Sequence, residues 1–205
     1  AEHILAILGR NAVHPDTVCE VGCGAGEVLA ELQRRMPAHV RFHGYEIASA
    51  AADLWRTRVN DRLAFTTGDF TTLVTPASDV LLCIDVVEHV PEYRVFLRAL
   101  RSRASLEVFH IPVEWSVYKV GMPGRLRRAT ELYGHVHFFT RRTALRALRD
   151  AGYVVLDDHY TVPGVECGKT LEARLGALPV RVVAWFSHGV AARLFGAHSL
   201  MVLVG

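Results

Sequence analysis

The chain has 205 residues, of which 51% are hydrophobic, and a formal net charge of +2 at pH 7. This length and apolar content predict a single domain, residues 1–205, built around one sizeable core. The charge is too small to indicate a nucleic-acid-binding protein, and no secretory signal or run of about 18 apolar residues predicts export or a membrane-spanning helix.

The first half of the chain alternates between strand and helix patterns. After a short helix at 2–8, strands are expected at 17–21, 40–46, 63–67, 79–84 and 104–110. Further helices are expected at 25–36, 48–59 and 91–101, and Pro91 suits the first turn of the last one, where an N–H has no partner anyway. This alternation predicts an α/β fold with a mostly parallel sheet and helices on both faces.

The first predicted strand runs into a glycine-rich turn. Residues 18–27 read V-C-E-V-G-C-G-A-G-E, which places Gly22, Gly24 and Gly26 at alternating positions behind Glu20. Glycine lets the backbone turn sharply and lets a ligand approach more closely than a Cβ would allow. Dinucleotide-binding loops read G-x-G-x-x-G, so the shorter G-x-G-x-G spacing argues against an NAD-dependent dehydrogenase.

Acidic residues follow three of the later strands. Glu46 ends the second strand about twenty residues after the last glycine, where a βαβ nucleotide-binding fold places a carboxylate on the ribose hydroxyls. Asp69 follows the third strand and Asp85 follows the fourth. Ligands of open α/β sheets bind outside the carboxyl ends of the strands, so these acids predict one site at that edge.

Two of these segments carry a family resemblance. The acid and glycine turn resemble motif I of the class I S-adenosylmethionine-dependent methyltransferases. The sequence D-V-V-E-H-V-P at 85–91 closely resembles the segment after the fourth strand of small-molecule O- and N-methyltransferases, including the ubiquinone type. The resemblance covers nearly the whole chain. It implies a Rossmann-like sheet of seven strands in the order 3-2-1-4-5-7-6, with the last strand, 198–204, antiparallel.

The resemblance also implies a cytoplasmic enzyme that transfers a methyl group from S-adenosylmethionine to an oxygen or nitrogen of a small molecule. Gly22, Gly24 and Gly26 would contact the methionine moiety of this cofactor. Glu20 would shape the loop or bind the amino group through a water. Asp85 would face the methyl group or the methionine end.

The adenosine end of the cofactor is assigned to the second and third strands. Glu46 would bind the ribose, because a carboxylate can accept from two vicinal hydroxyls at once. In the resembling family, the Asp of a "GD" pair accepts from the adenine amino group, which implies this role for Asp69. Phe70 would then pack on the ring, and Ile47 belongs to the same expected cofactor site.

Methyl transfer also needs the acceptor held in line with the donor, and usually a base that takes its proton. His89, His110 and His135 are the candidate bases, because an imidazole titrates near neutral pH. Each of them is also explained as a hydrogen-bonded structural histidine. The segment 112–138 is rich in glycine, aromatic and basic residues and follows the fifth strand, so we expect a substrate lid there.

A metal-assisted enzyme is the alternative. Asp85, Glu88 and His89, with His135 or His137 later in the chain, resemble the E-x-x-E-H…H metal site of the small-RNA terminal 2′-O-methyltransferases, with Asp85 in place of the first Glu. Oxygen and imidazole ligands suit Mg²⁺ or Mn²⁺, which could acidify a hydroxyl. The same acids also serve as caps at a helix start. A second alternative is a non-catalytic binding module with the same fold.

The remaining segments are a helix at 141–151, a strand at 153–156, and an extra helical insertion at 163–195. Residues 179–186 are apolar enough to be a helix that covers the sheet or contacts a membrane surface or a second copy. We expect the dimer contact, if formed, to use 178–195. Four cysteines are expected to be reduced: Cys19, Cys23, Cys83 and Cys167.

Overall fold

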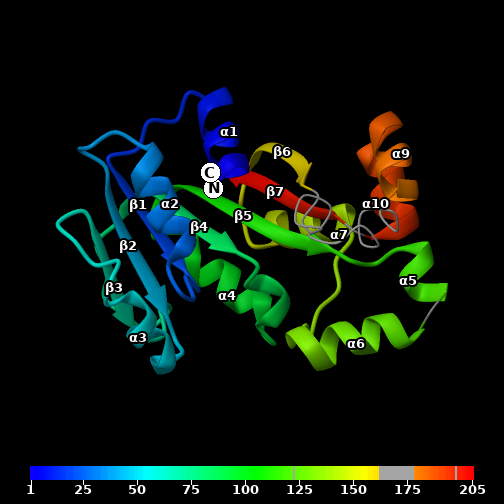
Figure 1. Ribbon diagram of the computed structural model, residues 1–205, viewed down its shortest axis with the longest axis horizontal. Coiled ribbons are helices and arrows are strands. Elements are labelled where there is room, and N and C mark those ends of the chain that lie inside the picture. Colours follow the sequence, from blue (N-terminus) through cyan, green and yellow to red (C-terminus); the bar gives the residue numbers. More distant parts are fainter. Residues whose placement is uncertain (122, 162–177, 197) are drawn as a thin grey trace.

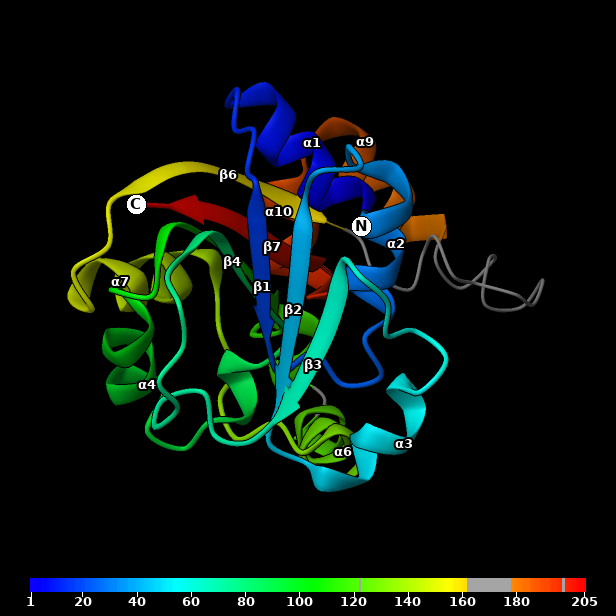
Figure 2. The same ribbon diagram turned by 90° about the vertical axis from the view of Figure 1, so that its left-hand side faces the viewer.

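The computed structural model describes residues 1–121, 123–161, 178–196 and 198–205, and these form one seven-stranded sheet with helices on both faces (Figures 1 and 2). The strand order is β3-β2-β1-β4-β5-β7-β6, and β7 is antiparallel to both of its neighbours. The predicted topology is therefore confirmed. The strands are β1 (Thr17–Val21), β2 (Arg41–Glu46), β3 (Leu63–Thr67), β4 (Ser78–Ile84), β5 (Ala104–Val113), β6 (Val155–Thr161) and β7 (His198–Val204).

The helical segments are connections between these strands and additions to them. Three precede or follow β1 and β2: α1 (Glu2–Arg10), α2 (Glu27–Arg35), and the short pair η1 (Ser49–Ala51) and α3 (Ala52–Trp55). The others are η2 (Val87–His89), α4 (Tyr93–Leu100), α5 (Val117–Gly121), α6 (Pro123–Tyr133), α7 (Arg141–Asp150), α9 (Leu178–Phe186) and α10 (His188–Phe195). None of the described helices is long and apolar enough to cross a bilayer.

Alternate side chains of the central strands divide the core between the two faces of the sheet. Val80 and Leu82 of β4 pack in the layer that includes α1 and α2, whereas Leu81 and Cys83 pack in the layer that includes α4 and α7. Figure 2 shows α4 and α7 on one side of the sheet and α2 on the other. Each fully buried leucine stabilises the fold by about 1.5–3 kcal/mol, so β4 and its neighbours form a rigid platform.

Several helices are shorter than their sequence patterns predict, among them α2, which covers 27–35 of the expected 25–36. The helix expected at 48–59 is only η1 and α3, and the chain turns after Trp55, whose indole donates to the Gly24 carbonyl at 2.7 Å and stacks on Phe65. Pro91 does not begin α4 but lies between η2 and α4. Its preceding residue, Val90, is extended (φ −89°, ψ 113°), as proline requires of the residue before it.

The second half departs from the prediction mainly by longer strands. β5 continues to Val113, past the expected end at residue 110, and pairs there with β7 alone. The segment 112–138 therefore leaves the sheet after Val113 and contains α5 and α6. Within the insertion expected at 163–195, residues 178–195 form α9 and α10, and residues 162–177, with Cys167, lie outside the described part of the chain.

Candidate active site

A cavity of about 720 Å³ lies at the carboxyl ends of β1, β2, β3 and β4. This volume is in the range of small-molecule sites. Its wall is mostly apolar on the side of η2 and α4, where Val86, Val90 and Phe96 line it. Six of the nine predicted cofactor residues line this cavity: Gly22, Glu46, Ile47, Asp69, Phe70 and Asp85.

Glu46 closes the glycine turn from the neighbouring strand. One carboxylate oxygen accepts from the backbone N–H of Gly24 at 3.0 Å, and the other accepts from the N–H of Ala48 at 2.9 Å. A carboxylate oxygen can accept more than one hydrogen bond, so each retains capacity toward the cavity. Glu46 is thus already held in place on the wall where a ribose would need an acceptor.

Asp69 has one carboxylate oxygen in a turn and one outside it. Its Oδ1 accepts from the backbone N–H and the hydroxyl of Thr71, at 2.9 and 2.7 Å. Within the described residues the second oxygen has no hydrogen bond. Phe70 is 4% exposed, packs edge-on against Tyr45, and carries the guanidinium of Arg103 over its ring. Asp69 therefore forms the turn through Oδ1 and keeps Oδ2 as an acceptor.

The glycine turn itself is held by tight packing. Gly22 and Gly26 have φ of +72° and +74°. An added Cβ would lie 2.5 Å from a Val86 methyl at Gly22 and 2.4 Å from the Phe65 ring at Gly26. Of the three glycines of the turn, only Gly22 lines the cavity, and Gly24 and Gly26 shape the turn behind it. Their contacts with the cofactor remain predictions.

Glu20 lies in the interior, outside the cavity wall. It is 2% exposed, and its Oε2 has no hydrogen-bond partner in the described structure. Burial raises the pKa of Glu20 to about 8. Its predicted role toward the cofactor amino group stays a prediction.

Asp85 is held in a strained conformation at the end of β4. Its φ of +52° lies in the left-handed region, which costs a non-glycine residue about 1–2 kcal/mol. Its N–H donates to the His110 carbonyl at 3.0 Å, and its Oδ1 lies 2.7 Å from His110 Nδ1. The other ring nitrogen of His110 lies 2.7 Å from the Thr161 hydroxyl. With both nitrogens engaged, the buried His110 is placed to hold Asp85, which favours the structural interpretation of this histidine over the catalytic one.

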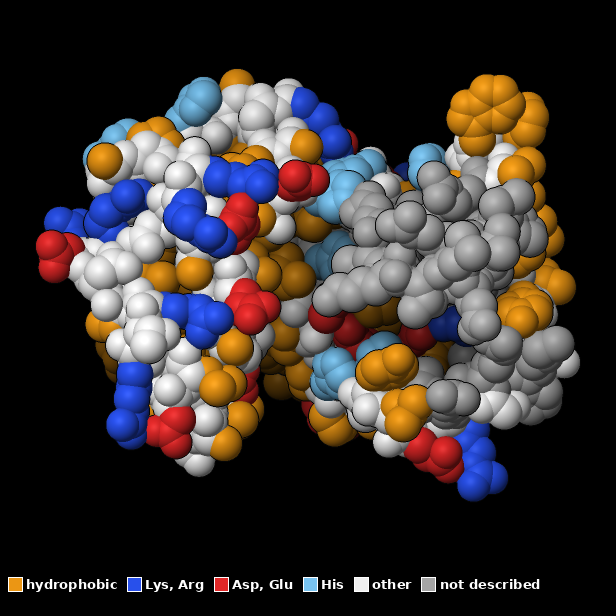
Figure 3. All heavy atoms as spheres, viewed as in Figure 1, with side chains coloured by type: hydrophobic (Ala, Val, Ile, Leu, Met, Phe, Trp, Pro, Cys, Tyr) orange, Lys and Arg blue, Asp and Glu red, His pale blue; other side chains and the backbone are white. Residues whose placement is uncertain are grey.

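A second cavity, of about 710 Å³, lies beside the first and shares Asp85 and His89 with it. Its wall also includes Glu88, Glu114 and His135, with Tyr133 from the end of α6. Figure 3 shows a hollow in this face of the molecule, with histidine and acidic side chains gathered beside it. The two cavities therefore adjoin each other at Asp85 and His89.

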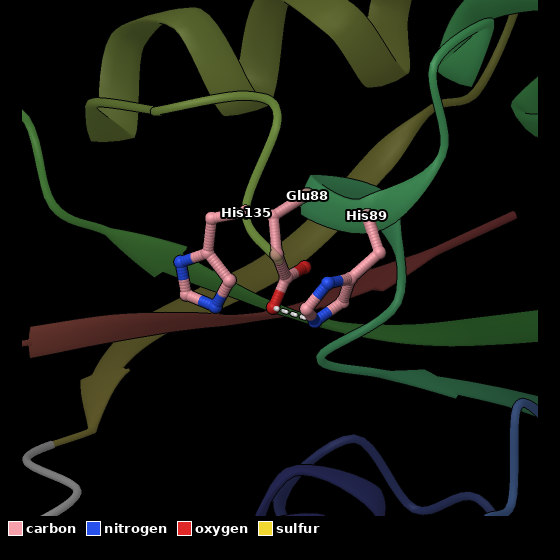
Figure 4. A group of neighbouring side chains, drawn as sticks. All are labelled: Glu88, His89 and His135. Atoms are coloured by element: carbon pink, nitrogen blue, oxygen red, sulfur yellow. Dashed lines mark ion pairs between the residues drawn. The ribbon is translucent and has the colours of Figure 1, made fainter. Parts of the chain in front are cut away.

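Glu88, His89 and His135 converge at the second cavity (Figure 4). One ligand atom from each lies within 4.8 Å of the others. His89 Nδ1 lies 3.2 Å from the Gly134 carbonyl oxygen, and His89 Nε2 lies 3.9 Å from Glu88 Oε1. A carbonyl can only accept, so His89 Nδ1 donates this bond. Nε2 faces the carboxylate: it forms an ion pair with it when the ring is protonated and presents a lone pair when the ring is neutral.

His135 repeats this arrangement from the other side. Its Nδ1 lies 2.5 Å from Glu114 Oε2, so Nδ1 donates to the carboxylate, and in the neutral ring Nε2 then carries the lone pair. Figure 4 shows one ring nitrogen of His135 directed toward Glu88 and the other directed away. With both rings neutral, two imidazole lone pairs and a carboxylate face one another, which is a donor set for a divalent transition metal such as Mn²⁺.

Glu88 is the least satisfied member of the cluster. It is 1% exposed, and neither carboxylate oxygen has a hydrogen-bond partner in the described structure. Burial raises the pKa of Glu88 to about 8. An unpaired buried carboxylate is costly, and a proton or a cation would relieve that cost. Asp85, included in the predicted metal set, does not belong to this group of three; it bonds to His110 instead.

Sequence reasoning missed Glu114 and Lys119. The Lys119 ammonium lies 2.5 Å from Glu114 Oε1, so the Glu114 carboxylate joins Lys119 of α5 to His135. Burial alone would raise the pKa of Glu114, but the hydrogen bonds from Lys119 and His135 outweigh burial and keep it below its usual range. No motif marks this pair; only the extension of β5 past residue 110 places Glu114 here.

Comparison with known proteins identifies the family of the chain. Residues 1–158 match the model of a family described as a methyltransferase domain. A search of curated proteins found no match.

Solved structures similar to the chain share its fold at low sequence identity. Magnesium protoporphyrin IX methyltransferase from Synechocystis PCC 6803 with bound SAH is 16% identical, with a TM-score of 0.62 over 99% of this chain and 80% of that one. An N-methyltransferase from Bradyrhizobium japonicum WM9 in complex with S-adenosyl-L-homocysteine is 13% identical, with a TM-score of 0.61 over 98% and 83%. The methyltransferase domain of bacterial CtHen1-CN is 16% identical, with a TM-score of 0.61 over 99% and 95%. The chain belongs to the methyltransferase domain family and is an S-adenosylmethionine-dependent methyltransferase.

Proposed function

We propose that this enzyme methylates an oxygen or nitrogen atom of a small-molecule acceptor bound in the second cavity. The observation that carries the proposal is the shared wall: Asp85 and His89 line both the cofactor cavity and the neighbouring one. An acceptor in the second cavity would meet the cofactor at these two side chains.

The first cavity fits S-adenosylmethionine by its donor set. Glu46 offers carboxylate oxygens at the position expected for the ribose, and the free oxygen of Asp69 can accept from the adenine amino group. The apolar side chains of η2 and α4 exclude water around the ring. When bound, the cofactor supplies an activated methyl group on a sulfonium. The chain's own residues then orient it: Gly22 lets the backbone approach, and the strained Asp85 lies at the boundary with the acceptor.

The acceptor's proton is assigned to a histidine of the second cavity. With Nδ1 donating to a fixed partner in each, the neutral rings of His89 and His135 present Nε2 as a proton acceptor for a hydroxyl or an amine. His89 belongs to both cavity walls and is the preferred base. Glu114 and the cavity residues of α6 would hold the remainder of the acceptor.

The test is a methyl-transfer assay on a panel of phenols, catechols, carboxylic acids and amines, with labelled S-adenosylmethionine and detection of the demethylated product. We expect transfer to at least one class, and a loss of turnover of at least tenfold for His89→Asn with cofactor affinity kept. Turnover of every accepted compound at the wild-type rate by His89→Asn would contradict the assignment of the base.

A second candidate function is metal-assisted 2′-O-methylation of an RNA terminus, and the cluster of Glu88, His89 and His135 favours it. These residues would hold a divalent cation, which would lower the pKa of a ribose hydroxyl. The donor set fits: two neutral imidazole nitrogens and one buried carboxylate lacking partners. Transfer to the terminal ribose of short RNA that depends on Mn²⁺ or Mg²⁺ would establish this function; absence of metal and of labelled RNA would end it.

We also infer a homodimer through α9 and α10. Val182, Trp185 and Phe186 of α9 are 51%, 82% and 77% exposed, so this helix does not bury its large apolar side chains against the described chain. Figure 3 shows hydrophobic side chains gathered at the end of the molecule where α9 lies. A second copy would cover such a patch. The described cysteines are unpaired and buried, which supports a cytoplasmic location.

A further inference from the structure

Glu114 makes two contacts that fix the state of a neighbouring ring. Its Oε2 accepts from His135 Nδ1, and its Oε1 accepts from the Lys119 ammonium, each at 2.5 Å. The side chains of all three residues are mostly buried: 12% exposed for Glu114, 19% for Lys119 and 11% for His135. Such a partly dehydrated charged group persists only when its geometry is well satisfied.

We propose that Glu114 is a positioning residue that sets the tautomer of His135, so that the Nε2 lone pair faces Glu88 and the acceptor cavity. The inference rests on the proposed function only for the role that His135 then has. A proton acceptor and a cation ligand need the same lone pair, so the tautomer matters in either role. The opposite tautomer would direct an N–H into the cavity and remove both capacities.

Lys119 determines which atom of residue 114 is left to face His135. Because the ammonium can only donate, it needs an oxygen at the Oε1 position. A carboxylate has a second oxygen for His135, whereas an isosteric amide does not. In Glu114→Gln the carbonyl oxygen stays with Lys119 and the NH₂ group turns to His135. Its Nδ1 must then accept, and the proton moves to Nε2. A packing role alone would leave the tautomer unchanged by this substitution.

The proposal is tested first by the tautomer itself. Long-range ¹H–¹⁵N spectra of the histidine rings, recorded on the neutral form without any acceptor, report which nitrogen carries the proton. His135→Asn assigns the signals. We expect the Nδ1–H tautomer in the wild type and in Lys119→Met, and the Nε2–H tautomer in Glu114→Gln. Glu131→Gln, an exposed residue of α6 paired with Arg127, is the charge-matched control and should match the wild type.

The second readout separates positioning from folding. Glu114 does not line the cofactor cavity, so Glu114→Gln should bind S-adenosylmethionine within about twofold of the wild type while turnover, with an acceptor, falls at least tenfold. A wild-type ring with its proton on Nε2 would overturn the proposal even if the variant fails to fold. So would a variant that switches tautomer with no loss of turnover. A protein that shows the expected tautomers but methylates nothing would overturn the proposed function and leave the role of Glu114 standing.

Discussion

The carboxylate of Glu46 accepts a hydrogen bond from the backbone N–H of Gly24, 22 residues earlier in the chain, at 3.0 Å. This bond joins the end of β2 to the turn that follows β1. It also places the acid at the mouth of the cofactor cavity. The structure thus uses one side chain to shape the turn and to present acceptors to a ligand.

Replacing Glu46 by alanine should weaken S-adenosylmethionine binding much more than it lowers the melting temperature. Hydrogen bonds to a charged group are worth about 1.5–3 kcal/mol each, so calorimetry should show an affinity roughly ten- to a hundredfold lower. Glu46→Gln keeps the shape of the side chain, so its affinity should lie between those of the wild type and the alanine variant. Unchanged affinity in the alanine variant would refute the ribose role.

Gly26→Ala should destabilise the fold by about 2–4 kcal/mol in urea denaturation. The left-handed φ of +74° contributes about 1–2 kcal/mol of strain, and the new Cβ would meet the Phe65 ring at 2.4 Å. Gly9→Ala is the control: this helical glycine has open space around it, and the change should be neutral or stabilising by up to about 1 kcal/mol. Equal stability of the two variants would show that the turn tolerates a side chain.

Divalent cations should raise the melting temperature if Glu88, His89 and His135 form a metal site. A ligand that binds only the folded state stabilises it by RT ln(1 + [L]/Kd), so the increase should grow with Mn²⁺ concentration and disappear with a chelator. His135→Asn should abolish the increase. His137→Asn is the control, because His137 bonds to the Pro91 carbonyl at 2.9 Å and lies outside the cluster. An equal response in both variants would place the cation elsewhere.

Stability should fall between about pH 4.3 and pH 7 through Glu107. Burial raises the pKa of Glu107 to about 7, and Tyr153 donates to its carboxylate at 2.7 Å. An unfolded glutamate titrates near pH 4.3, so within this window the folded state binds the extra proton and loses stability as pH rises. Complete ionisation costs about 4 kcal/mol at most, from about 2.7 pKa units at 1.36 kcal/mol each. Glu107→Gln has no carboxyl to ionise, so its free energy of unfolding relative to the wild type should be higher at pH 8 than at pH 5. Denaturant titrations at the two pH values measure this, and the same difference at both would contradict the prediction.

The patch on α9 should hold two copies together. Light scattering should find a dimer that dissociates on dilution, and Trp185→Ser with Phe186→Ser should give a monomer with an unchanged circular dichroism spectrum. Val74→Ser is the control, because this fully exposed apolar residue lies in the loop between β3 and β4. A wild-type monomer at all concentrations would rule out this interface.

Much of the fold was predictable because the strands carry strong local patterns. Val80 to Cys83 form a continuous apolar run that only a strand covered on both faces requires, and the order of the strands followed from the resemblance. The helices were less predictable. The backbone closes in a turn after Trp55, where the Arg58 N–H donates to the Trp55 carbonyl at 2.7 Å, and the Trp55 indole bonds to Gly24, 31 residues away.

The candidate site likewise contains residues that could be predicted from the sequence and residues that could not. Glu46, Asp69 and Asp85 could be assigned because each comes directly after a strand, and the sheet brings strand ends together. Glu114 could not, because its place depends on where β5 ends. Once that strand reaches Val113, alternation puts Glu114 on the same side as Pro112, at the second cavity. Likewise, the protonation of each ring nitrogen depends on carbonyl and carboxylate partners that only the folded chain supplies.

The position of β7 constrains the order in which the molecule assembles. This strand lies between β5 and β6 but follows both in the chain, so β6 cannot join the sheet until β7 has been inserted. The hydrogen bond from His110 on β5 to Thr161 on β6 spans that insertion, and His110 in turn holds Asp85. The orientation of Asp85 is therefore completed by a late pairing between segments distant in sequence, a slow class of folding event. A nascent chain would form its glycine turn early and fix the side chain of Asp85 late.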